Sequence, residues 1–204
     1  PVFYSWQGAA SSVARINKII DGLVTPSCTG TLISTRSGSG PLYFLTANHC
    51  LSSSGVVAPN SDAIARTFTF TWFFQHPACT GSSPSLGVQT IGATYVDSRG
   101  TADGDFALLV LSQPPPSGVV KAGWDPRDPP PVGTSVVGIH HPQGSWKAGS
   151  LGLRRADEST STNLGFLSSN KYITVYWDYG TTEGGSSGSP LFSTPGQVLG
   201  TLTA

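Results

Sequence analysis

The chain has 204 residues, enough for one substantial core or two small ones fused together. Charged residues make up only 11% of it and its formal net charge is zero, whereas about 25% of an average soluble domain is charged. This balance gives no electrostatic attraction for nucleic acid or for an anionic membrane. The 25 glycines and 16 prolines favour an all-β protein with many turns.

No stretch approaches the roughly 20 apolar residues of a membrane span, and no signal peptide stands at the N-terminus. The sequence also contains no methionine. We therefore expect a mature or excised piece of a protein. Its composition resembles that of secreted bacterial enzymes more than that of cytosolic ones, so we expect an extracellular location.

The first predicted elements are strands. Residues 13–23 are the least clear, and fit either a short helix or a strand of irregular pattern. Residues 28–33 and 42–46 flank a Gly/Ser-rich turn and predict a β-hairpin. His49 stands just past the end of this hairpin, where a side chain can be presented at the edge of a sheet.

A clean alternation of aromatic residues and threonine predicts the next strand, at 66–72. One face of this strand is expected to lie in the core, because alternation with period two is typical of half-buried strands. Two further strands are predicted at 92–96 and 106–111. Together these strands would complete a first sheet.

Three acidic residues, Asp97, Asp103 and Asp105, precede the strand at 106–111. Asp105 directly adjoins the apolar run and is expected to be half-buried. A buried carboxylate can hold an imidazole in one tautomer and stabilise the imidazolium. We therefore favour Asp105 as the partner of His49, with Asp103 as the alternative.

Proline runs at 114–116 and 129–131 predict an extended connection, because proline cannot enter a central strand. The strands predicted beyond it are 132–140, 171–177, 191–192 and 198–202. His140 and His141 invite a metal or catalytic interpretation. Adjacent residues of a strand point to opposite faces, however, so we favour a structural one.

Residues 184–190, Gly-Gly-Ser-Ser-Gly-Ser-Pro, have the composition of a nucleophile loop. Small neighbours let a carbonyl approach the backbone, and glycine permits dihedrals that point successive N–H groups into one spot. We interpret Ser187 as the nucleophile and the N–H groups of Gly185 and Ser187 as an oxyanion hole. A flexible Gly/Ser loop is the plain alternative. A serine nucleophile needs a base and a group to orient that base, and His49 and Asp105 would supply them.

With these three side chains in this order, the chain resembles the trypsin-like serine proteases. The shared motifs are Thr-Ala-x-His-Cys at 46–50, Asp-x-Ala-Leu-Leu at 105–109 and Gly-x-Ser-Gly-x-Pro at 185–190. The chain is more similar still to the bacterial lysyl endopeptidases, a secreted branch of that family. Segments 43–50, 122–128, 138–142, 185–190 and 198–200 carry this resemblance, which runs from about Cys28 to the end of the chain.

The resemblance implies an all-β fold of two antiparallel six-stranded β-barrels, the second incomplete at its C-terminus. Residues 1–113 would form the first barrel, 114–131 the connection and 132–204 the second barrel. The resemblance further implies a disulfide between Cys28 and Cys50, with Cys79 left over; two buried thiols are the alternative. Neither the cysteines nor His76 shows a zinc-like spacing, so no metal site is expected.

The implied activity is that of a monomeric serine endopeptidase, without cofactor, that acts on peptides or proteins and cleaves after lysine. Three residues are expected near the pocket for that lysine, namely Thr181, Glu183 and Thr203. Thr181 stands six positions before Ser187. A threonine cannot compensate a buried ammonium. In the lysyl endopeptidases the required acid lies downstream of the point where this chain stops, so we expect the piece alone to be truncated and poorly active.

Two other interpretations are weighed against this one. A protease-like domain with little or no turnover would act as a binding module, since fold alone never proves activity. An esterase of the α/β-hydrolase kind does not fit, because His49 precedes Ser187 in the chain.

Trypsin carries an aspartate where this chain has Ser186, which leaves the activation route open.

Overall fold

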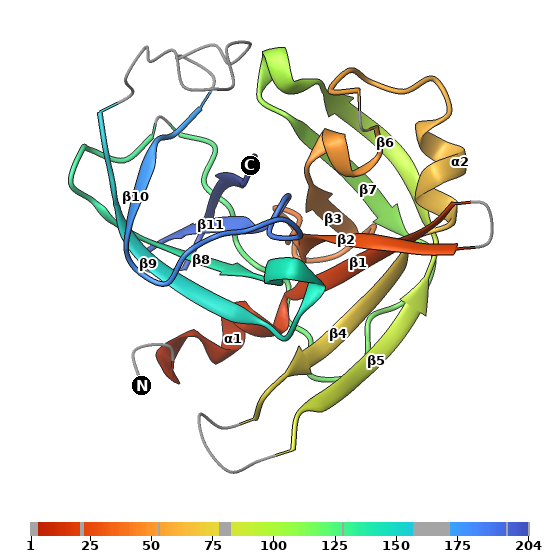
Figure 1. Ribbon diagram of the computed structural model, residues 1–204, viewed down its shortest axis with the longest axis horizontal. Helices are drawn as coiled ribbons and strands as arrows, with labels where there is room; N and C mark the ends of the chain where they lie inside the picture. Colours follow the sequence, from red (N-terminus) through yellow and green to blue (C-terminus); the bar gives the residue numbers. More distant parts are fainter. Residues whose placement is uncertain are drawn as a thin grey trace.

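Two antiparallel sheets account for most of the regular structure in the computed structural model (Figure 1). The structure describes residues 4–20, 23–52, 54–77, 83–127, 129–156, 172–194 and 196–203. The all-β prediction is confirmed. The described sheets hold seven and five strands, however, instead of six each, and the described strand pairing does not close either sheet into a ring.

The first sheet has the spatial order β5-β4-β1-β2-β3-β7-β6. Its strands are β1 (Val13–Ile20), β2 (Leu23–Leu32), β3 (Tyr43–Thr46), β4 (Thr69–Gln75), β5 (Ser85–Ile91), β6 (Ala93–Arg99) and β7 (Phe106–Leu111). The predicted hairpin is present, with Thr31 paired to Leu45 and Leu32 to Phe44. Strand β3 lies between β2 and β7, so the segments that follow β3 and precede β7 meet at one end of the sheet.

The second sheet has the order β10-β9-β8-β11-β12. Its strands are β8 (Ser135–His140), β9 (Ala148–Arg154), β10 (Val175–Tyr179), β11 (Pro190–Ser193) and β12 (Val198–Thr201). The described residues also form two short helices, α1 (Gln7–Ser11) and α2 (Ser61–Arg66), and neither was predicted. Single helical turns occur at Tyr4–Trp6, Asn48–Cys50, Thr101–Asp103 and Pro142–Gly144.

Each sheet has its own group of buried apolar side chains. In the first group, the ring of Phe44 packs edge to face with Phe70 and with Trp72, at centroid distances of 4.8 Å and 5.9 Å respectively. The aromatic face predicted for 66–72 is therefore in the core. The strand itself begins only at Thr69, because Arg66 is the last residue of α2 and Thr67 caps that helix.

The second group joins residues from distant parts of the chain. Val13 of β1 packs with Val137 and Ile139 of β8, Phe192 of β11 and Val198 of β12. The connection between the sheets also pairs with both: Ala122 bridges to Ile33, and Trp124 bridges to Val198. The start of β1 and the connection thus pack against the second sheet.

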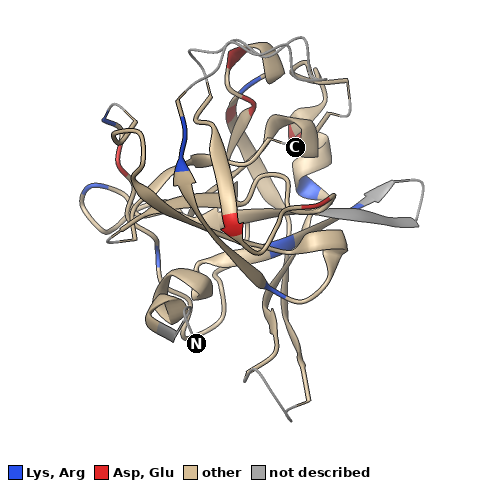
Figure 2. Ribbon diagram, turned by 60° about the vertical axis from the view of Figure 1, so that its left-hand side comes forward, with Lys and Arg blue, Asp and Glu red and all other residues tan. Residues whose placement is uncertain are grey.

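The few charged residues are spread over several elements of both sheets (Figure 2). Among the described helices, none has the length and apolar character needed to span a bilayer.

Candidate active site

His49 lies in the helical turn Asn48–Cys50, directly after β3. Cys28 of β2 and Cys50 form a disulfide with an S–S distance of 2.03 Å, as the family resemblance implied. This bond ties the turn that carries His49 to the neighbouring strand. The sulfur atoms lie within 4.8 Å of a ring nitrogen of His49, but because they are bonded to each other they are not available as thiolate ligands for a metal.

Asp105 precedes β7 and is completely buried. Its Oδ2 lies 2.6 Å from Nδ1 of His49, and its Oδ1 accepts a hydrogen bond from the backbone N–H of His49 at 3.0 Å. An ionised carboxylate only accepts hydrogen bonds, so Nδ1 carries the proton and Nε2 is left as the basic atom. Asp103, the alternative partner, is exposed.

Thr203 contacts the same carboxylate. Its Oγ1 donates a hydrogen bond of 2.9 Å to Oδ2 of Asp105. Thr203 was predicted only to lie beside a substrate pocket. In the structure Thr203 also contacts Asp105, whose buried carboxylate thus has three donors: the backbone N–H of His49, Nδ1 of His49 and the hydroxyl of Thr203.

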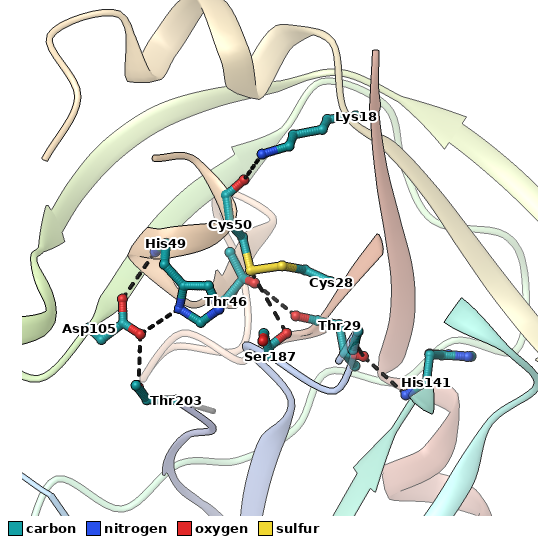
Figure 3. The surroundings of a disulfide bond; sticks show 11 residues. Lys18, Cys28, Thr29, Thr46, His49, Cys50, Asp105, His141, Ser187 and Thr203 are labelled. Carbon is teal, nitrogen blue, oxygen red and sulfur yellow. Dashed lines mark hydrogen bonds and ion pairs between the residues drawn. A yellow bond between two sulfur atoms is a disulfide. The ribbon is translucent and has the colours of Figure 1, made fainter. Parts of the chain in front are cut away.

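Ser187 and His49 line one cavity of about 190 Å³. In Figure 3 the His49 ring lies between the Asp105 carboxylate and Ser187. The other residues of the lining are Ile16, Lys18, Cys28, Cys50 and Phe68. The structure therefore brings together the three side chains that the sequence placed in one site.

The loop that carries Ser187 is fixed by residues of the first sheet. The N–H of Thr29 donates to the carbonyl of Ser187, and the Thr29 hydroxyl donates to the carbonyl of Gly185, both at 2.8 Å. Gly188 has φ +79°, and a Cβ there would lie 2.2 Å from Oγ1 of Thr46 and 2.4 Å from the carbonyl of Thr29. Only glycine fits this contact.

A tight turn precedes Ser187. The N–H of Ser186 donates to the carbonyl of Glu183 at 2.9 Å, and Gly185 at the third position has φ +90°. These are the features of a type II turn. The carbonyl of Gly184 accepts a hydrogen bond from the N–H of Gln143 at 2.6 Å. Because a trans peptide holds its C=O and N–H on opposite sides, the N–H of Gly185 points away from the segment that contains Gln143.

His140 and His141 are buried at the end of β8. Burial lowers the pKa of His140 to about 4. Burial, together with the ammonium of Lys147, lowers the pKa of His141 to about 3. Both rings are therefore neutral near pH 7. Nδ1 of His140 lies 2.8 Å from the hydroxyl of Ser186, a contact that the sequence did not suggest.

A second cavity, of about 420 Å³, lies beside the loop that carries Ser187. Its lining includes Tyr172, Trp177, Thr182, Leu202 and Thr203. Of the predicted pocket residues only Thr203 is among them, since Thr181 and Glu183 are exposed and lie outside this lining. No acidic side chain of the described residues lines this cavity. Cys79 lies outside the described part of the chain, so its pairing stays a prediction.

The two antiparallel sheets define the class as a chymotrypsin-like fold, and solved structures share it. The crystal structure of Deg5 matches with a TM-score of 0.60 at 17% identity, over 98% of this chain and 82% of that chain. The inactive form of the Rv3671c protease matches with a TM-score of 0.56 at 20% identity, over 97% of this chain and 80% of that chain.

The sequence comparisons are more specific. The family model for the lysyl endopeptidase C-terminal domain matches residues 3–204, so the chain belongs to this family of trypsin-like serine proteases. A lysyl endopeptidase of Pseudomonas aeruginosa is 30% identical over 175 residues, which cover 83% of this chain and 34% of that protein. The chain thus spans about a third of the length of this relative.

Proposed function

We propose that the chain is the catalytic domain of a secreted serine endopeptidase with the triad His49, Asp105 and Ser187. One observation carries the proposal: His49 is held through Nδ1 by a buried carboxylate at 2.6 Å and shares a cavity with Ser187. This arrangement leaves Nε2 as the base on the serine side of the ring.

In the proposed mechanism the hydroxyl of Ser187 attacks a peptide carbonyl while Nε2 of His49 accepts its proton. The negative charge formed on the carbonyl oxygen is stabilised by the N–H groups of Gly185 and Ser187. His49 then protonates the leaving amine, and the C–N bond breaks to give the acyl-enzyme. Water, deprotonated by His49, attacks the ester and releases the acid and the free serine. Asp105 orients the ring and stabilises the imidazolium. No step requires a cofactor.

We further propose cleavage after lysine, with a peptide or protein as the substrate. The support is the family to which the chain belongs and the relative named for this activity. A lysine ammonium requires a counter-ion when it is buried. Because the described lining of the second cavity holds no acid, this proposal requires a carboxylate from residues other than those.

A single labelling experiment tests both levels of the proposal. Peptidyl phosphonates that carry either lysine or phenylalanine next to phosphorus are incubated with the full-length protein, alongside a fluorophosphonate without a peptide. The fluorophosphonate should form a covalent adduct on Ser187, found by peptide mapping, and the lysine reagent should react faster than the phenylalanine reagent.

The variants separate the roles. His49→Ala should abolish labelling, and Asp105→Asn should slow it by several orders of magnitude without unfolding the chain. Labelling that survives His49→Ala would refute the assigned base. A faster reaction of the phenylalanine reagent would refute only the lysine specificity.

A further inference from the structure

We propose that His140 is a positioning residue, which acts through the hydroxyl of Ser186 to hold the 183–186 turn in the form that presents the N–H of Gly185. The inference rests on the proposed function, because that N–H matters only if it binds an oxyanion. His140 lies in the second sheet and touches neither the nucleophile nor its base in the described contacts.

A chain of hydrogen bonds runs from the turn through the imidazole. The N–H of Glu183 donates to Oγ of Ser186 at 3.1 Å, and this Oγ lies 2.8 Å from Nδ1 of His140. On the other side of the ring, Nε2 lies 3.0 Å from Oγ of Ser150, which donates to the carbonyl of Thr181 at 3.0 Å.

The groups at the two ends of this series of hydrogen bonds determine which atom donates in each of them. Because the Thr181 carbonyl can only accept, the Ser150 hydrogen is committed to it, and Ser150 must accept from Nε2–H of His140. A neutral ring with the proton on Nε2 has a bare Nδ1, which accepts from the hydroxyl of Ser186. Ser186 in turn accepts the N–H of Glu183. Every hydroxyl therefore donates once and accepts once, and the ring is a single tautomer.

Ser186 holds Glu183 at two points. Its side chain accepts the N–H of Glu183, and its own N–H donates to the carbonyl of the same residue. The two bonds close the turn that has Gly185 at its third position. The alternative turn, with the Gly184–Gly185 peptide inverted, would point a carbonyl where the N–H now points.

Burial makes the imidazole indispensable to this arrangement. His140 is 1% exposed, and Ser186 and Ser150 are completely buried. Water does not reach the Ser186 hydroxyl, so removal of Nδ1 leaves that hydroxyl without an acceptor, which is costly in a buried site. The hydroxyl would then turn toward another acceptor and release Glu183. Strand β8 is paired with β9 and β11 on both sides, which holds His140 in place.

The test uses the full-length protein and steady-state hydrolysis of one peptide ester. Ser186→Ala and His140→Phe should each lower kcat on the order of 10²-fold, with KM within about threefold of the original, because the oxyanion is bound only in the transition state. His140→Gln keeps an acceptor and a donor and should recover part of the loss. The variant that combines Ser186→Ala with His140→Phe should have a kcat no lower than that of either single variant, since both substitutions break the same series of hydrogen bonds.

Ser12→Ala is the matched control. Ser12 is also a completely buried serine, whose Oγ lies 2.6 Å from the carbonyl of Ala9 and 2.9 Å from Oγ1 of Thr31. Its substitution should lower the melting temperature much as Ser186→Ala does, but leave kcat unchanged. The proposal is overturned if His140→Phe keeps kcat within about threefold, or if Ser12→Ala lowers kcat equally.

A second measurement does not depend on turnover. The ¹⁵N chemical shifts of His140, assigned by comparison with His140→Gln, should show a protonated Nε2 and a bare Nδ1 at neutral pH. The opposite tautomer, or an imidazolium, would overturn the hydrogen-bond chain. If the original chain neither hydrolyses the ester nor reacts with the phosphonates, the proposed function fails. The tautomer would still decide whether His140 supports the turn.

Discussion

At the scale of single residues, Thr203 illustrates how a neighbouring side chain can orient a member of the proposed triad. Its hydroxyl is one of three donors to the carboxylate of Asp105. Hydrogen bonds to a charged group contribute about 1.5–3 kcal/mol. Without this one, the carboxylate would be less firmly oriented toward Nδ1 of His49.

Thr203→Val, which keeps the shape of the side chain, should therefore lower kcat/KM on the order of tenfold. Thr203→Ser keeps the hydroxyl and should retain most of the activity. The measurement is the hydrolysis of one peptide ester by the three forms, with thermal melting to show that each is folded. Equal activity of the valine and serine forms would contradict a role for this hydrogen bond.

The principal site residues were predictable because each needs a particular chemical neighbour. An imidazole after a strand, a carboxylate before an apolar run and a serine among glycines are visible in the sequence, and the structure places them in one site. The link from His140 to Ser186 was not predictable. Two buried histidines look alike in a sequence, and only the fold determines which ring nitrogen meets which hydroxyl.

At the scale of elements, the disulfide fixes the segment that carries His49. It joins β2 to the helical turn after β3, with a sequence separation of 22. The bond restricts the unfolded chain, and the loop-entropy estimate for a loop of this size is about 3 kcal/mol. It also supports the turn in which His49 lies.

Replacement of Cys28 and Cys50 by alanine should therefore lower the free energy of unfolding by about 3 kcal/mol and slow the phosphonate labelling of Ser187. Urea denaturation and labelling rates measure the two effects. Reduction of the original chain is the companion experiment, since it opens the bond without changing the sequence. Unchanged stability in both cases would show that the bond does not constrain the chain.

Most of the strands were predictable from alternation and from β-branched runs, and their boundaries were less so. Residues 28–33, 42–46 and 106–111 lie in or next to β2, β3 and β7 as predicted. Strands β5 and β9 were missed because their sequences, Ser-Leu-Gly-Val-Gln-Thr-Ile and Ala-Gly-Ser-Leu-Gly-Leu-Arg, contain glycine, which disfavours strands when it is taken alone. Pairing with β4 and with β8 and β10 outweighs this local preference.

At the scale of the whole molecule, Lys147 joins three separate parts of the chain. Its Nζ donates to the carbonyl of Ala10 in α1 at 2.6 Å, and its backbone N–H donates to the carbonyl of Phe74 in β4 at 2.9 Å. Burial lowers the pKa of Lys147 to about 7. The usual value in an unfolded chain is about 10.4.

At a pH between about 7 and about 10.4, the Lys147 side chain is protonated in the unfolded chain and deprotonated in the folded chain. The contribution of Lys147 therefore makes the free energy of unfolding rise as the pH increases from about 7 to about 10. Lys147→Met should remove this rise, and chemical denaturation of both forms at several pH values would measure it. The difference between the two curves isolates Lys147 from the other groups that titrate. Parallel curves would contradict the prediction.

The hydrogen bonds from Thr29 to the nucleophile loop also affect when activity can appear. Thr29 and Ser187 are far apart in the sequence, and their contact requires that the first sheet has formed and that the loop of the second has packed against it. Contacts between such distant residues form late, because the loop that they close is long. Under the proposed function, a newly made chain would carry His49, Asp105 and Ser187 well before they could act together, and would not cleave neighbouring proteins until folding is complete.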